Sequence, residues 1–177
     1  MVKVGITQYQ YVSSNGFDDT SFIHIDGRLI DRMTKLAIHT ARLIYEKGNC
    51  KDISPERLGI AVSTETGAID SIFEYCQNLR QNGYKGVNPS KFPNIMLSTC
   101  LSRIAKEVQA MGPSIPFYSD KGIDTALQYS VLQIKKQRCD AMMLFKVSCS
   151  KDCFGMLIEN AEFSKHRCRD IKLLLDL

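Results

Sequence analysis

The segment from residue 112 to residue 122 limits the possible folds of this chain more than any other stretch. Gly112-Pro113 is a turn that ends a preceding helix, because proline lacks the N–H that a helix interior requires. Residues 115–118 then form a short apolar strand, and the polar residues 119–121 lead into a helix predicted over 122–136. A strand that turns sharply into a helix is typical of α/β proteins.

Strands and helices alternate in the same way along the rest of the chain. Residues 141–147 are apolar apart from Lys146, which indicates a strand in the middle of a sheet. Neither an internal repeat nor a linker is apparent, so we expect residues 1–177 to form one domain, a mixed sheet with helices on both faces. The predicted strands are 2–7, 58–63, 115–118, 141–147, 154–159 and 171–175; the predicted helices are 31–46, 68–80, 89–99, 102–110, 122–136 and 162–168.

Charge and hydropathy exclude several classes of partner. The net charge is +4, and no basic run exceeds Lys135-Lys136, so no nucleic-acid partner is predicted. No apolar run approaches the roughly 20 residues that span a bilayer, so no membrane association is expected. Residues 1–6 lack the pattern of a secretory signal, and we therefore expect a cytoplasmic protein.

The seven cysteines are an odd number and widely spaced, which favours free thiols that pack as small apolar side chains. Cys149 and Cys153 form the only close pair. Together with His166 and Cys168 they make a zinc site conceivable, but no second pair with suitable spacing follows. We therefore predict neither a metal site nor a cofactor.

Several motifs resemble, in their order and spacing, the N-terminal half of the β-ketoacyl synthases. The resemblance covers nearly the whole chain and implies a thiolase-like half-domain, with a five-stranded mixed sheet and helices on both faces. The motifs are Val4-Gly5-Ile6-Thr7 with Val12-Ser13-Ser14-Asn15-Gly16, Asp31-Arg32-Met33-Thr34-Lys35-Leu36-Ala37, residues 57–67, Gly112-Pro113-Ser114, residues 139–144, and residues 154–159 with Ala161-Glu162.

Two departures from this family bear on catalysis. The family consists of two similar halves and is about twice as long, and its two catalytic histidines belong to the second half. Its nucleophilic cysteine corresponds here to Ser119 or Asp120, and no cysteine occurs between Cys100 and Cys139. The three histidines of this chain, at positions 24, 39 and 166, match no catalytic position of the family.

The candidate site therefore centres on the elbow after residue 118. A serine needs an adjacent base to become a nucleophile, and the simpler interpretation is that Ser119 or Asp120 caps the helix that Lys121-Gly122 begins. A candidate pocket comprises Cys100, Phe117, Tyr118 and Lys121, although core packing explains Cys100, Phe117 and Tyr118 as well. Lys146 is open to two interpretations, as a satisfied residue at a strand end or as a residue that points into a cavity.

The resemblance implies a ketosynthase-like protein without ketosynthase chemistry. We expect an accessory subunit of fatty-acid, polyketide or aryl-polyene-type biosynthesis, comparable to a chain length factor, that binds a ketosynthase or an acyl carrier protein. The alternative is an acyltransferase or thioesterase-like enzyme that uses Ser119 or Cys100 as nucleophile, and a degenerate protein that no longer binds acyl groups is a third possibility. The expected assembly is a homodimer through strand 115–118 and the 89–110 helices, or a heterodimer with a ketosynthase.

Overall fold

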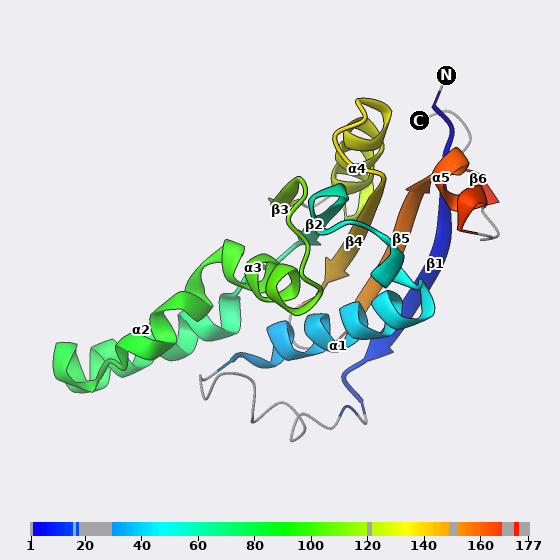
Figure 1. Cartoon of the computed structure of the whole chain (residues 1–177). Helices are drawn as coiled ribbons and strands as arrows, with labels where there is room; N and C mark the ends of the chain where they lie inside the picture. The colour runs from blue at the N-terminus through cyan, green and yellow to red at the C-terminus, as the bar shows by residue number, and fades with distance from the viewer. Residues whose placement is uncertain are drawn as a thin grey trace.

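One mixed sheet organises the computed structural model, which describes residues 2–15, 17, 30–119, 122–148, 152–167 and 172–173 (Figure 1). The strand order is β3-β2-β4-β5-β1-β6. Strands β2, β3 and β4 are parallel to one another, whereas β5, β1 and β6 pair antiparallel. The strands are β1 (Val4–Ser13), β2 (Leu58–Thr64), β3 (Ser114–Tyr118), β4 (Ala141–Val147), β5 (Asp152–Asn160) and β6 (Lys172–Leu173).

The mixed α/β architecture predicted from the sequence is confirmed, with one addition to the sheet. The resemblance implied five strands, and the two-residue strand β6 adds a sixth beside β1. It pairs only with Gly5 and Ile6, so it extends the sheet by a short ladder. Strand β1 is longer than predicted because the alternating pattern continues to Ser13, paired along its length with β5.

Helices cover both faces of the sheet. α1 (Arg32–Lys47) and α3 (Leu97–Glu107) lie on one face, and α4 (Asp124–Lys135) lies on the other. The short α5 (Ala161–His166) follows β5 directly. The remaining helices are α2 (Ile69–Asn82) and the 3₁₀ helices η2 (Cys50–Asp52), η3 (Pro55–Arg57), η4 (Gly83–Gly86) and η5 (Pro89–Ile95).

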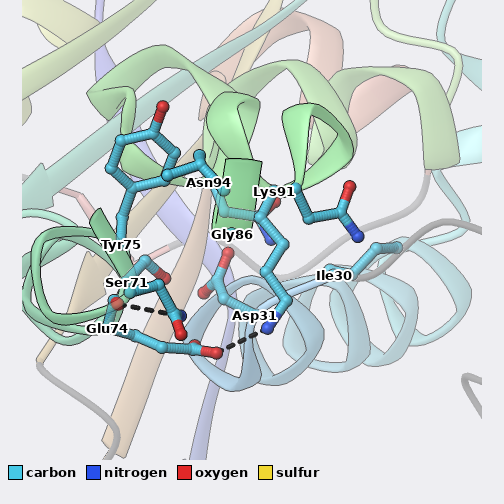
Figure 2. A pocket seen from close by; sticks show the side chains of 11 residues that line it. Ile30, Asp31, Ser71, Glu74, Tyr75, Gly86, Lys91 and Asn94 are labelled. Carbon is cyan, nitrogen blue, oxygen red and sulfur yellow. Dashed lines mark hydrogen bonds and ion pairs between the residues drawn. The ribbon is translucent and has the colours of Figure 1, made fainter. Parts of the chain in front are cut away.

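Residues 69–95, from α2 to η5, form an arm that projects from the sheet (Figure 1). No residue of α2 is buried, and Phe73 and Tyr84 are 66% and 90% exposed. The predicted helices 89–99 and 102–110 are wrong in their boundaries, because Pro93 lies in a 3₁₀ helix and Met96 is extended before α3 begins. Where the arm meets the start of α1, it encloses a hollow (Figure 2).

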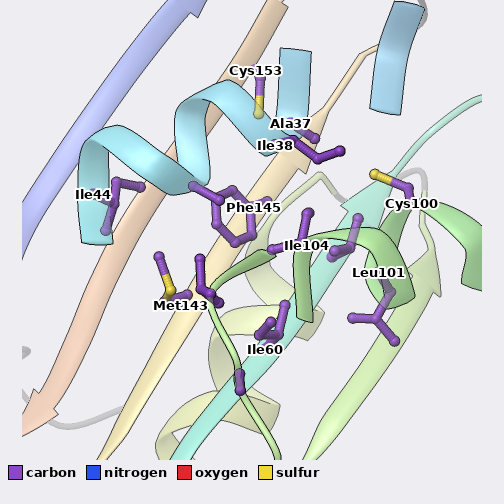
Figure 3. Packing of buried hydrophobic residues seen from close by; sticks show 14 of the residues in the cluster. Ala37, Ile38, Ile44, Ile60, Cys100, Leu101, Ile104, Met143, Phe145 and Cys153 are labelled. Carbon is purple, nitrogen blue, oxygen red and sulfur yellow. The ribbon is translucent and has the colours of Figure 1, made fainter. Parts of the chain in front are cut away.

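The core has two layers, one on each side of the sheet. Ile60 and Met143 point to the α1 and α3 side, while Ala61 and Met142 point to the α4 side, as alternation along a strand requires. Phe145 lies between α1, α3 and the strands, and it is fully buried (Figure 3). Every residue of β2 is buried, which suits an inner strand covered on both faces.

Candidate functional site

The carboxyl ends of β2, β3 and β4 lie together at one edge of the sheet, because these three strands are parallel. The register places Thr64 beside Tyr118, and Ser63 beside Lys146. Polar residues from three distant parts of the sequence therefore meet where the strands end. Ligands of open α/β sheets bind at this edge, so we take it as the candidate site.

Ser119 occupies the elbow that follows β3. Its backbone N–H donates a hydrogen bond of 3.0 Å to the carbonyl oxygen of Thr64, and the residue is only 9% exposed. Helix α4 begins at Asp124 with Ile123 in the N-cap position, so Ser119 does not cap this helix and that part of our prediction is wrong. The other two elbow residues of the sequence analysis, Asp120 and Lys121, lie outside the described residues.

Lys146 leaves the end of β4 and forms an ion pair with Glu65, with 2.7 Å between the lysine Nζ and the Glu65 Oε1. Of the two interpretations given to Lys146, the structure supports the satisfied residue at a strand end. The ammonium also lies against Gly122, where an added Cβ would be 3.4 Å from Nζ. Gly122 has a φ of +64°, and its carbonyl accepts a hydrogen bond from the Ser63 hydroxyl.

The aromatic residues of β3 diverge. Phe117 meets Tyr129 of α4 edge to face, with 5.6 Å between the ring centroids, and it packs against the core layer on that side. Tyr118 is 71% exposed at the end of β3, the edge strand of the sheet. Only Phe117 therefore lines the interior, and Tyr118 belongs to the outer surface.

Cys100 lies in the other core layer, between α1 and α3 (Figure 3). Burial raises the pKa of its thiol well above the usual value, and the negative charge of Asp31 raises it further. The thiol is therefore protonated at neutral pH. Because Cys100 and Phe117 lie on opposite faces of the sheet, the structure does not bring the residues of the candidate pocket together.

Metal ligands do not gather in the part of the chain that the structure describes, where no three or more His, Cys, Asp and Glu side chains form a cluster. Cys153 is fully buried in the core, and burial raises its pKa to about 12. Cys149 and Cys168 fall outside the described residues. The pKa of His39 is lowered by burial and then by Arg42. No helix within the described ranges is long and apolar enough to cross a membrane.

The hollow beside the arm was not predicted from the sequence. It has a volume of about 350 Å³, and its charged lining consists of Asp31 before α1, Glu74 on α2 and Lys91 on η5. Glu74 and Lys91 form an ion pair across it, with 2.5 Å between Oε1 and Nζ (Figure 2). No local sequence pattern links these positions, because their approach depends on how the arm folds back toward α1.

Neither a family model nor a curated protein matches this sequence. Solved structures, in contrast, match the fold over almost the whole chain. One is a chain of a type II polyketide synthase acyl carrier protein in complex with its ketosynthase, with a TM-score of 0.86, 14% identity, and coverage of 97% of this chain and 66% of that one. The chain folds as a thiolase-like half-domain.

Two further structures support this assignment. A β-ketoacyl synthase from Burkholderia phymatum matches with a TM-score of 0.78 and 13% identity, over 97% of the half-domain and 62% of the other chain. The ishigamide ketosynthase/chain length factor matches with a TM-score of 0.75 and 17% identity, over 90% and 63%. At this level of identity the likeness establishes the fold alone. The half-domain spans less than two thirds of the length of these three chains.

Proposed function

We propose that this protein is a non-catalytic, cytoplasmic ketosynthase-like subunit that acts beside a true ketosynthase in fatty-acid, polyketide or aryl-polyene-type biosynthesis. Its role would be that of a chain length factor, with an acyl carrier protein as the second partner. One observation carries the proposal. The fold is that of the ketosynthases, yet the elbow after β3 contains no thiol, since no cysteine lies between Cys100 and Cys139.

The chemistry of the strand ends supports a non-catalytic role. A serine becomes a nucleophile when a neighbouring base removes its proton. Among the described residues, the side-chain amine at this edge is that of Lys146, which is paired with Glu65 as an ammonium and has no lone pair to accept a proton. The buried thiol of Cys100 lies on one face of the sheet and is protonated at neutral pH.

The outer edge of β3 supports a partner that adds a strand. The backbone N–H of Ser119 points to β2. Because backbone groups alternate in direction along a strand, those of Pro116 and Tyr118 point away from β2. Pro116 has no N–H to lose there, which is where an edge strand tolerates proline. The outward groups on this edge are thus the N–H and carbonyl of Ser114 and Tyr118 and the carbonyl of Pro116. Strand addition at such an edge is a known mode of recognition.

An acyl carrier protein fits the mild positive charge of the chain. The net charge of +4 favours association with an acidic partner, chiefly through a faster encounter. Among the similar structures, one is described as an acyl carrier protein with its ketosynthase and another as a ketosynthase in complex with its chain length factor from Xenorhabdus doucetiae. These assemblies provide the pattern for the partners proposed here.

Light scattering of the purified protein, alone and with a ketosynthase encoded in the same genome, tests the partnership. We expect a defined heterodimer mass when the two are mixed. A homodimer that ignores the ketosynthase would contradict the accessory role and would favour a self-sufficient protein.

Intact-mass analysis after incubation with acyl thioesters tests the absence of catalysis. We expect no covalent adduct at any acyl chain length. An adduct that Ser119→Ala abolishes would establish the alternative, an acyltransferase or thioesterase-like enzyme with a serine nucleophile. An adduct that persists in Ser119→Ala and maps to Cys100 would assign the nucleophile to that thiol instead.

A further inference from the structure

The hollow between the arm and the start of α1 has the size of a ligand site. Its volume of about 350 Å³ lies at the lower end of the range of roughly 300–1,000 Å³ that small-molecule sites occupy. Its walls come from α2, η5 and the residues just before α1 (Figure 2). The strand-end site consists of other residues, so a ligand here would have a separate role.

The wall offers hydrogen-bonding groups of both kinds. Asn78 uses its side-chain nitrogen to donate to the Glu74 carbonyl at 3.0 Å, which leaves the carboxamide oxygen as an acceptor. Asn88 uses its side-chain oxygen to accept from the Ser90 N–H at 2.9 Å, which leaves the carboxamide nitrogen as a donor. Hydroxyl groups both donate and accept, so they suit a wall of this composition.

The charge of the wall favours a cation. Asp31 and Glu74 contribute two carboxylates, and Lys91 compensates one of them. The smaller hollow next to it adds Arg32 and Asp70, which cancel each other, so the charged side chains among the described lining residues of both hollows still sum to −1. Asp31 accepts from the Thr34 N–H at 2.9 Å through Oδ1 and from the Thr34 hydroxyl at 2.7 Å through Oδ2. A carboxylate has about four lone-pair sites, so it can still accept from a ligand ammonium.

We propose that this cavity binds a small hydroxylated amine of about monosaccharide size. The ligand's ammonium would lie against Asp31, and its hydroxyl groups would bond to Asn78 and Asn88. The charge excess disfavours a carboxylate-bearing molecule of the same size, and a neutral polyol lacks the charge-assisted bond. The proposal rests on the lining residues of this cavity alone, so it holds whether or not the ketosynthase-like role is correct.

Titration of ¹⁵N-labelled protein with D-glucosamine at about pH 6, where such an amine is protonated, tests the site. D-Glucose and D-glucuronate serve as neutral and anionic probes of the same size. We expect saturable chemical-shift changes in α2, η5 and the start of α1, with glucosamine tightest and glucuronate weakest. Absence of saturable binding by glucosamine, shift changes elsewhere, or tighter binding of glucuronate would each overturn the proposal.

Two variants that change the charge of the wall in opposite directions separate recognition of charge from damage to the fold. Asp31→Asn removes the charge but keeps a good N-cap for α1, and we expect about tenfold weaker binding of glucosamine. Lys91→Gln removes the compensating cation, and we expect severalfold tighter binding. Asp52→Asn, a surface carboxylate that does not line the cavity, should leave the affinity unchanged. Weaker binding in both Asp31→Asn and Lys91→Gln would contradict the assignment.

Discussion

At the scale of single residues, burial divides the described cysteines into two groups. Cys50, Cys100, Cys139 and Cys153 are buried, whereas Cys76 on α2 is exposed. Burial raises the pKa of both Cys139 and Cys153 to about 12. Since the thiolate is the reactive form, a thiol with this pKa is ionised in only about one molecule in ten thousand at pH 8.

We therefore predict that iodoacetamide at pH 8 labels Cys76 at least about a hundredfold faster than any of the four buried thiols. Because a raised pKa delays ionisation, labelling of Cys139 and Cys153 should stay slow as the pH rises from 8 to 10. Peptide mapping by mass spectrometry assigns each rate to its residue. Labelling of Cys100 as fast as that of Cys76 would contradict the buried environment and restore Cys100 as a reactive thiol.

The sequence identified some site residues and could not identify others, for a physical reason. Ser119 was found because the turn, the short strand and the polar elbow are contiguous. The ion pair of Lys146 with Glu65 was missed because it depends on the parallel register of two strands far apart in the sequence. The sequence analysis also offered core packing for Cys100, and the structure agrees, because Cys100 is buried. An apolar helix face predicts such burial directly.

At the scale of elements, the Gly112-Pro113 turn is fitted to the start of β2. The Gly112 N–H donates to the Leu58 carbonyl at 2.9 Å, and the Ile60 N–H donates to the Pro113 carbonyl at 3.0 Å. A Cβ at Gly112 would lie 2.6 Å from the Leu58 oxygen, which is backbone and cannot move aside. The glycine that marks this turn in the sequence is thus required by close contact between two chain segments.

We expect Gly112→Ala to lower the free energy of unfolding by about 1–3 kcal/mol, because β2 and the turn must separate. Chemical denaturation measures this loss. Gly83→Ala provides the comparison, since nothing lies within 4 Å of its added Cβ and only its φ of +59° opposes a side chain. With ψ at −164°, this backbone lies in a region used essentially by glycine alone, so a loss of about 1–3 kcal/mol is expected from backbone strain without any steric contact. Wild-type stability of Gly112→Ala would show that the turn can relax away from β2.

Predictability also differed among the elements. Strand β4 has the predicted bounds because a continuous apolar run fixes an inner strand at both ends. The arm was predicted less well, because its residues bury little surface and their periodicity carries less information. At η5 the local effect of Pro93 determines the helix type, and the hydrophobic pattern does not.

At the scale of the whole molecule, the two edges of the sheet differ. One edge carries β1 and the short β6, and the other is the five-residue strand β3. If two copies pair antiparallel about a twofold axis at Phe117, each Tyr118 N–H meets the Pro116 carbonyl of the other copy. This gives two hydrogen bonds. Centred on Pro116 instead, the central pair has no N–H at all, and each Tyr118 faces Ser114 of the other copy, so the Tyr118 N–H takes part in either register.

Tyr118→Pro removes the outward N–H that bonds in either register, while the pairing of β3 with β2 stays intact. Pro116 shows that the strand accepts proline at such a position. The loss of two hydrogen bonds of about 1 kcal/mol each should weaken self-association roughly 30-fold. Light scattering over a range of concentrations measures this change. Tyr118→Ala keeps the backbone N–H and should weaken self-association less. Tyr9→Ala changes an exposed residue of β1, far from this edge in the strand order, and should have no effect. Equal association of Tyr118→Pro and the wild-type protein would exclude β3 as the interface, and the exposed apolar residues of the arm would then be the surface to test.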